Sequence, residues 1–185
     1  MRSIIINAGC ILSGILLISM PVLSQVKTNP STTSSVKMKT DQNLQNNKTA
    51  VYKLYTEILN TGKFELLNHV ISDDYDGVQG EKGPTGFAQA VAPVRAAFPD
   101  IKWTIDDIIA EGDEVMTRWS WIGTYTNAFN GVPPTHQTIT HHAITIFKFS
   151  NGKISKGWME SDRLGFFLQT GVIPAGLIPA PPVKK

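Results

Sequence analysis

The chain has 185 residues with 17 basic and 15 acidic side chains, a formal net charge of +2, and one cysteine, Cys10. Because the basic residues are dispersed, nucleic acids and anionic membrane surfaces have little electrostatic support as partners. A lone cysteine near the N-terminus excludes disulfides, cysteine nucleophiles and thiolate metal sites from the rest of the chain.

Residues 1–24 have the pattern of a secretory signal peptide. Arg2 supplies a positive charge, an apolar stretch runs from Ile4 to Ile18, and small or apolar residues precede a cut after Ser24. We predict export to the periplasm or the medium after cleavage near Ser24, with membrane contact only through this segment. The alternatives are an uncleaved anchor, although the run is shorter than the roughly 20 residues of a spanning helix, and a lipoprotein modified at Cys10, although most of the run follows that cysteine.

Residues 25–47 are polar and poor in large apolar side chains. Such a segment buries too little surface to offset its ordering entropy, so it is predicted to be a flexible linker. The folded domain is predicted over 48–171. The remaining segment, 172–185, is a proline-rich tail that suits neither a helix nor a central strand.

The first half of the domain predicts three helices. Apolar residues from Val51 to Leu59 recur at helical spacing, and Gly62 suits the C-terminal stop. Pro93 bends the third helix or marks its true start. The helices are predicted from 46 or 47 to 62, over 64–70 and over 85–98, with a loop over 72–84 that Tyr75 anchors.

From Ile101 the apolar period changes to two, which predicts strands joined by tight turns. Helices followed by an antiparallel meander indicate an α+β fold, with helices on one face of a curved sheet. The strands are predicted over 103–110, 114–125, 136–149 and 153–161, followed by a short closing helix.

Several motifs, taken in order, resemble the SnoaL-like polyketide cyclases, or ester cyclases, of the nuclear-transport-factor-2-like (NTF2-like) superfamily. They are FPDIKWTIDDIIAEGDEVMTRWSWIGTYT, GVPPTHQTIT, NGKI and W…DRLGFFLQTG, within a resemblance that covers 51–171. It implies a cone-shaped α+β barrel of three N-terminal helices, a curved antiparallel sheet and a short C-terminal helix. It also implies a pocket between sheet and helices, and a homodimer. The superfamily includes cyclases, isomerases, dehydratases and binding modules, so the fold does not select a function.

The resemblance also implies a pair of catalytic positions. Characterised cyclases carry an acid/base aspartate on the last strand, seven residues after the glycine of the hairpin turn, and a histidine on the preceding strand. Counting from Gly152 leads to Met159, and the histidine position corresponds to Thr145. A thioether and a hydroxyl cannot abstract a carbon-bound proton near neutral pH.

The register of the last hairpin decides which other side chains face the pocket. A three-residue turn with Gly152 as a bulge places Met159 opposite Ala143, whereas a two-residue turn places Glu160 there. We favour the bulged turn because it puts both catalytic positions on one face. The predicted pairs are then Ala143–Met159, His142–Glu160 and His141–Ser161. The predicted concave side holds His141, Ala143, Thr145 and Met159, and the outer side holds His142, Ile144, Trp158 and Glu160.

Three residues are candidates for catalysis. His141 is the remaining pocket base, or a half-buried histidine hydrogen-bonded to a backbone or serine group. Glu160 is a relocated carboxylate or the cross-strand partner of His142, and Asp162 is a further carboxylate candidate or the cap of the closing helix. The candidates for substrate contact are Tyr75, Trp119, Trp121, Thr145 and Met159.

Neither a metal site nor a nucleotide cofactor is expected. His141 and His142 are adjacent on a strand and therefore point to opposite faces. The chain also lacks a phosphate-binding glycine loop.

Three functions remain open from the sequence. The first is an exported module that binds a small hydrophobic or carbonyl-containing molecule, which we favour because of Met159. The second is a proton-transfer enzyme, an aldol-type cyclase or isomerase that uses His141 or a relocated carboxylate without a metal or nucleotide. The third is an interaction domain that dimerises through the outer face of the sheet around Trp158.

Overall fold

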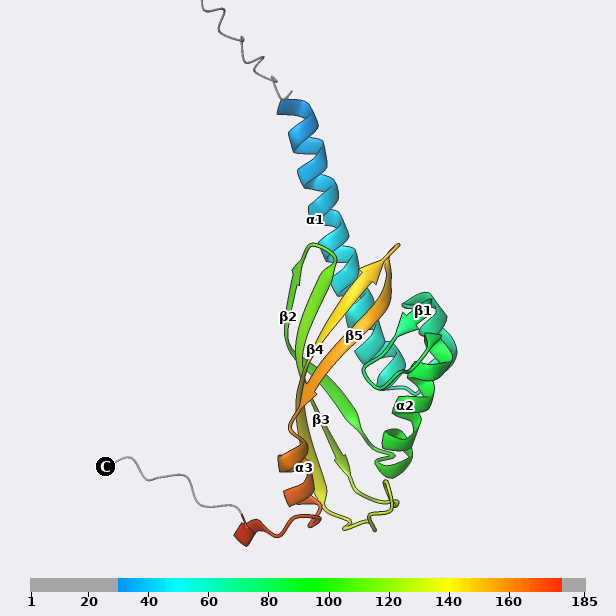
Figure 1. The fold of residues 1–185 in the computed structure, drawn as a ribbon, viewed down its shortest axis with the longest axis vertical. Helices are drawn as coiled ribbons and strands as arrows, with labels where there is room; N and C mark the ends of the chain where they lie inside the picture. Colours follow the sequence, from blue (N-terminus) through cyan, green and yellow to red (C-terminus); the bar gives the residue numbers. More distant parts are fainter. Residues whose placement is uncertain (1–29, 178–185) are drawn as a thin grey trace, which may run out of the picture.

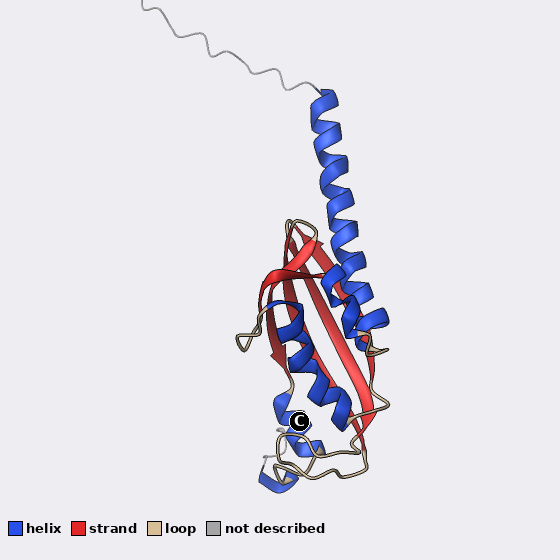
Figure 2. Cartoon of the chain, turned by 90° about the vertical axis from the view of Figure 1, so that its right-hand side faces the viewer, coloured by secondary structure: helices blue, strands red, loops and turns tan. Residues whose placement is uncertain are grey.

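The computed structural model describes residues 30–177, which form a curved five-stranded sheet with helices on one face (Figure 1). Figure 2 shows the helices as a layer in front of the sheet. This arrangement confirms the predicted α+β class, with a sheet that is curved but not closed. The predicted signal peptide lies outside the described residues. No helix within 30–177 is long and apolar enough to cross a membrane.

The elements follow the predicted order of helices before strands, with one additional strand. The helical elements are α1 (Pro30–Lys53) with its π-helical continuation η1 (Leu54–Leu59), the 3-10 helices η2 (Phe64–His69) and η3 (Ala175–Leu177), α2 (Gly83–Ala97) and α3 (Arg163–Gln169). The strands are β1 (Ile71–Asp76), β2 (Lys102–Glu111), β3 (Glu114–Thr124), β4 (Thr138–Ser150) and β5 (Lys153–Ser161), in the sheet order β1-β5-β4-β3-β2.

Helix α1 begins at Pro30, within the segment for which the sequence predicts a flexible linker, and it projects beyond the sheet (Figure 1). Its other end and η1 are anchored in the core, where Val51 and Leu54 are fully buried. Once this anchored end is helical, each added residue gains a hydrogen bond without a new nucleation cost. Side-chain bonds one turn apart, such as that from Gln42 to Asn46 at 3.0 Å, support the exposed part.

Strand β1 occupies the start of the stretch predicted as a loop, and the prediction is wrong there. It pairs in parallel with β5 at one edge of the sheet, whereas the other strand pairs are antiparallel. Ile71 and Tyr75 are its buried apolar residues, and the residues between them are polar. Two apolar positions are too few for an alternating pattern, so the sequence signal for this strand is weak.

The hairpin between β4 and β5 turns through Asn151 and Gly152, which have φ values of 51° and 77°. Two consecutive residues with positive φ define a two-residue type I′ turn, so the three-residue turn favoured from the sequence is wrong. The observed pairs beyond the turn are Thr145–Met159, Ile144–Glu160 and Ala143–Ser161. They replace the predicted pairs Ala143–Met159, His142–Glu160 and His141–Ser161.

A bulge in β5 nevertheless preserves the predicted faces. Phe149 pairs with Ile154 and Lys148 with Lys156, so Ser155 is an extra residue without a partner in the ladder. One extra residue reverses the inside–outside alternation of the strand from there on. The concave side therefore holds His141, Ala143, Thr145 and Met159, and the outer side holds His142, Ile144, Trp158 and Glu160, as the burial alternation along both strands confirms.

Candidate functional site

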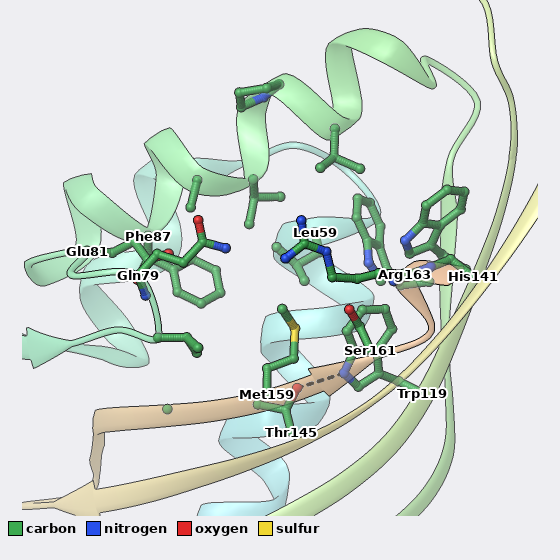
Figure 3. Close-up of a pocket in the computed structure, with 18 of the residues that line it drawn as sticks. Leu59, Gln79, Glu81, Phe87, Trp119, His141, Thr145, Met159, Ser161 and Arg163 are labelled. Atoms are coloured by element: carbon green, nitrogen blue, oxygen red, sulfur yellow. Dashed lines mark hydrogen bonds between the residues drawn. The ribbon is translucent and has the colours of Figure 1, made fainter. Parts of the chain in front are cut away.

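A pocket of about 760 Å³ lies between the concave face of the sheet and helices α2 and α3. Strands β3, β4 and β5 supply one wall, and apolar residues of α2 such as Phe87, Val91 and Val94 supply the opposite wall. Figure 3 shows this arrangement, with the side chains of the two walls facing each other. The position between sheet and helices is the one that the family resemblance implies.

The floor of the pocket is formed by Met159 on β5 and Thr145 on β4, which are directly opposite in the ladder. The hydroxyl of Thr145 is already engaged, because the indole Nε1–H of Trp119 donates to it over 2.8 Å (Figure 3). Tyr55 of η1 also lines the pocket, and its side chain lies beside Thr145. Burial raises the pKa of its phenol, although hydrogen bonds with Thr117 and Thr145 act in the opposite direction. The floor thus has no side chain that is charged at neutral pH.

His141 is half-buried among three aromatic rings, with ring-centroid distances of 5.4 Å to Trp121, 5.8 Å to Phe166 and 6.2 Å to Trp119. Its Nδ1 is buried without a hydrogen-bond partner. The predicted hydrogen bond to a backbone or serine group is therefore absent in the described part of the chain. The second ring nitrogen, Nε2, has no hydrogen bond to another residue within 30–177 and is not among the buried unpaired atoms, so it is the nitrogen available to the pocket.

Burial lowers the pKa of the His141 imidazole, and the nearby charge of Asp162 only partly opposes this effect. The imidazole is therefore neutral at pH 7. A neutral ring can accept or donate one hydrogen bond at Nε2. No carboxylate among residues 30–177 is hydrogen-bonded to it, so His141 stands alone rather than in a dyad.

Neither of the two candidate carboxylates is hydrogen-bonded to the imidazole. Glu160 is exposed at the rim of the pocket and lies opposite Ile144, so its predicted cross-strand pairing with His142 is wrong. Asp162 caps helix α3, where its Oδ1 accepts a hydrogen bond from the backbone N–H of Gly165 over 2.8 Å. The structure therefore confirms the capping interpretation of Asp162.

The three aromatic residues predicted to contact a substrate all line the pocket. Trp119 and Trp121 project from β3 and are almost fully buried. Tyr75 projects from β1, packs edge-on against Phe87 at 5.8 Å, and is also buried. Its hydroxyl lies so close to Gly157 that a Cβ at that glycine would come within 3.0 Å of it. Glycine at this position therefore leaves space for the phenol at the pocket wall.

Sequence reasoning missed the polar residues of the pocket mouth. Arg163 extends from the first turn of α3 over Met159 (Figure 3), and its guanidinium lies 5.8 Å from the ring centre of Phe167. Ser161, Gln79 and Glu81 also border the cavity. One signal for Arg163 was present, since a residue directly after a helix cap at the end of a pocket strand must lie near that pocket.

The described residues do not form a metal site. No group of three or more His, Cys, Asp or Glu side chains between residues 30 and 177 is arranged to hold a metal ion. The arrangement can enclose an apolar body, and it can offer one neutral imidazole and one guanidinium to polar atoms of that body.

Comparisons with known proteins agree with this geometry. The family model for SnoaL-like polyketide cyclases matches residues 49–170. Solved structures with the same fold include a SnoaL-like polyketide cyclase candidate from Jannaschia sp. CCS1, with a TM-score of 0.64 and 20% identity over 70% of this chain and 94% of that one. A polyketide cyclase candidate from Acidithiobacillus ferrooxidans has a TM-score of 0.62 and 27% identity, covering 69% and 95% of the two chains.

A third solved structure, the polyketide cyclase candidate IdmH from Streptomyces antibioticus, has a TM-score of 0.59 and 28% identity, covering 68% of this chain and 98% of that one. A search among curated proteins found no match. The family model spans well over half of the chain, and the fold and the pocket agree with it. The chain therefore belongs to the SnoaL-like polyketide cyclase family.

Proposed function

We propose that this protein is an exported binding domain that holds a small organic molecule with an apolar body and a carbonyl group. The observation that carries the proposal is the floor of the pocket, where Met159 faces Thr145 and the Thr145 hydroxyl is occupied by Trp119. We take these two positions to be those of the acid/base aspartate and the histidine in the catalytic relatives. Neither side chain here can carry a proton to or from carbon at neutral pH.

The rest of the pocket supports binding rather than proton transfer. The aromatic rings of Trp119, Trp121, Phe87 and Phe166 offer a large apolar contact area. Small-molecule sites typically combine such walls with a few polar groups that fix orientation. His141 can serve as one of these groups through Nε2.

A second candidate function is a proton-transfer enzyme of the cyclase or isomerase type. The free imidazole of His141 supports it, because an unpaired base in an apolar pocket has a pKa below its ordinary value and is unprotonated at pH 7. The lone position of this ring argues against efficient catalysis, since catalytic imidazoles are usually oriented by a second group.

Export is part of the proposal and rests on the sequence of residues 1–24 alone. It is tested by expressing the full chain in a bacterial host and determining the N-terminal residue of the exported protein. A mature N-terminus at Gln25 supports cleavage after Ser24. A product that keeps Arg2 and stays in the cytoplasm would overturn it.

We also propose a homodimer that forms through the outer face of the sheet. Ile109, Met116, Ile146 and Trp158 are successive partners across β2, β3, β4 and β5, which gives an apolar row over four strands. Ile109, Ile146 and Trp158 are exposed by 59, 37 and 42%. An exposed apolar row of this length is typical of an interaction surface.

Binding and catalysis are separated by one pair of measurements. The binding function predicts that an aryl ketone such as 1-acetonaphthone quenches the tryptophan fluorescence saturably. Met159→Asp, in the pocket, should weaken this binding, whereas Ile122→Asp, on the exposed outer face, should not. The same ketone is then incubated in deuterium oxide. Enzyme-dependent exchange of its α-hydrogens that is abolished by His141→Gln would favour the proton-transfer enzyme instead. Absence of saturable quenching would overturn both.

A further inference from the structure

Arg163 is the one cationic side chain among the described residues that line the pocket. It is exposed at the mouth, yet its side chain extends over Met159 toward the interior of the cavity (Figure 3). Two carboxylates also border the cavity. Glu81 lies at the opposite end, where it accepts a hydrogen bond from the backbone N–H of Gln79 over 2.8 Å, and Glu160 is exposed on the rim.

The guanidinium of Arg163 has no polar partner within residues 30–177. Neither an ion pair nor a hydrogen bond with these residues engages its N–H groups, and the centre of the Phe167 ring lies 5.8 Å from its Cζ atom. The neighbouring Asp162, which would be its natural partner, is committed to capping α3 through Gly165. A ring contact leaves the N–H groups at the edge of the guanidinium free for a planar acceptor.

The other polar groups near this end of the pocket can also donate hydrogen bonds. Nε2 of His141 is open to the cavity, whereas Nδ1 is buried and unpaired. A buried N–H without an acceptor costs free energy, whereas an N–H on the nitrogen that faces the cavity can donate to water or a ligand. The neutral ring is therefore expected to carry its proton on Nε2. The hydroxyl of Ser161 borders the same region.

We propose that this end of the pocket recognises a carboxylate, so that the ligand is a hydrophobic organic acid. Arg163 binds the two carboxylate oxygens side-on, and Nε2–H of His141 donates to one of them. The aromatic wall encloses the apolar body. This inference rests on the proposed binding function and specifies its ligand class.

The test compares 1-naphthoate with its uncharged methyl ester by isothermal titration calorimetry of the purified protein. A charge-assisted, bidentate contact is expected to favour the acid by about tenfold or more. Arg163→Gln should remove this preference, because it lowers the affinity for the acid far more than the affinity for the ester. Arg163→Lys should retain part of the preference, because it keeps the charge but loses the planar pair of donors.

Arg118→Gln is the matched control, since it removes the same charge from the outer face of the sheet, where Arg118 pairs with Asp106 and Asp107. The control should keep the full preference for the acid. Equal binding of acid and ester, unchanged by Arg163→Gln, would overturn the carboxylate inference and leave the binding function standing. If neither compound binds, the proposed function fails as well.

Discussion

Trp119 donates its indole N–H to the Thr145 hydroxyl over 2.8 Å, a contact that joins β3 to β4 directly beneath the pocket. Both side chains are buried. Thr145→Val should therefore leave a buried donor without a partner and lower the free energy of unfolding by about 1–3 kcal/mol. Urea denaturation monitored by circular dichroism measures this change.

The double variant Trp119→Phe/Thr145→Val is the companion measurement, because it removes donor and acceptor together. Its loss of stability should be smaller than the sum of the two single losses. Strict additivity would mean that the indole and the hydroxyl do not interact in solution.

The stability of the protein should depend on pH through His141. Burial lowers the pKa of this imidazole from its ordinary value of 6.5, with Asp162 and His142 as the nearby charged groups. Between the native pKa and about pH 6.5 the unfolded chain binds more protons than the native one, so the free energy of unfolding falls as the pH is lowered through this window and then levels off. Urea midpoints recorded from about pH 7.5 to about pH 5 should show this slope.

His141→Gln should reduce that slope, because glutamine has no ionisable group. His142→Gln is the matched control, since His142 is the adjacent histidine and is exposed on the opposite face of the sheet. If both variants show the slope of the unaltered protein, burial of the His141 imidazole is not its source.

Asp162 should contribute to the stability of the protein by capping helix α3. Asp162→Ala is expected to lower the free energy of unfolding by about 0.5–2 kcal/mol, because the N–H of Gly165 loses its acceptor. Asp162→Asn should be close to the unaltered protein, since asparagine is an equally good cap. A variant with asparagine that folds normally but loses a measurable turnover would assign the carboxylate a catalytic role instead.

The apolar row on the outer face should hold two copies of the chain together. Ile146→Lys places a charge in the centre of this row and should convert a dimer into a monomer in sedimentation velocity, with unchanged circular dichroism. Leu164→Lys, at an exposed apolar residue of α3, is the control and should remain dimeric. A monomeric unaltered protein at high micromolar concentration would contradict the proposed dimer.

The strands β2 to β5 were predictable because apolar and polar residues alternate regularly along each of them. Lys153–Ser161 matches the predicted strand at both ends, since an Asn-Gly turn and the cap at Asp162 bound it. The extent of α1 was not predictable from composition, because its polar part is stabilised by continuity with a buried end that lies further along the chain. Strand β1 depends on pairing with β5, a contact between distant segments that leaves little trace in its own sequence.

The candidate site was predictable in its walls but less so in its polar groups. Trp119, Trp121 and Met159 follow from strand alternation once the fold is assumed. The isolation of His141 is a property of packing, because three aromatic rings from β3 and α3 lie around its imidazole and Nδ1 is buried without a partner. The direction of the Arg163 side chain likewise depends on how α3 meets the sheet.

The bulge at Ser155 decides which side chain of β5 reaches the cavity. The two-residue turn alone would direct Glu160 into the cavity and Met159 outward, and the single extra residue exchanges them. The chemical character of the cavity floor, apolar or acidic, thus depends on one extra residue of β5 near a surface turn. Deletion of Ser155 would remove the bulge and direct the carboxylate of Glu160 toward the floor of the pocket in place of the Met159 thioether.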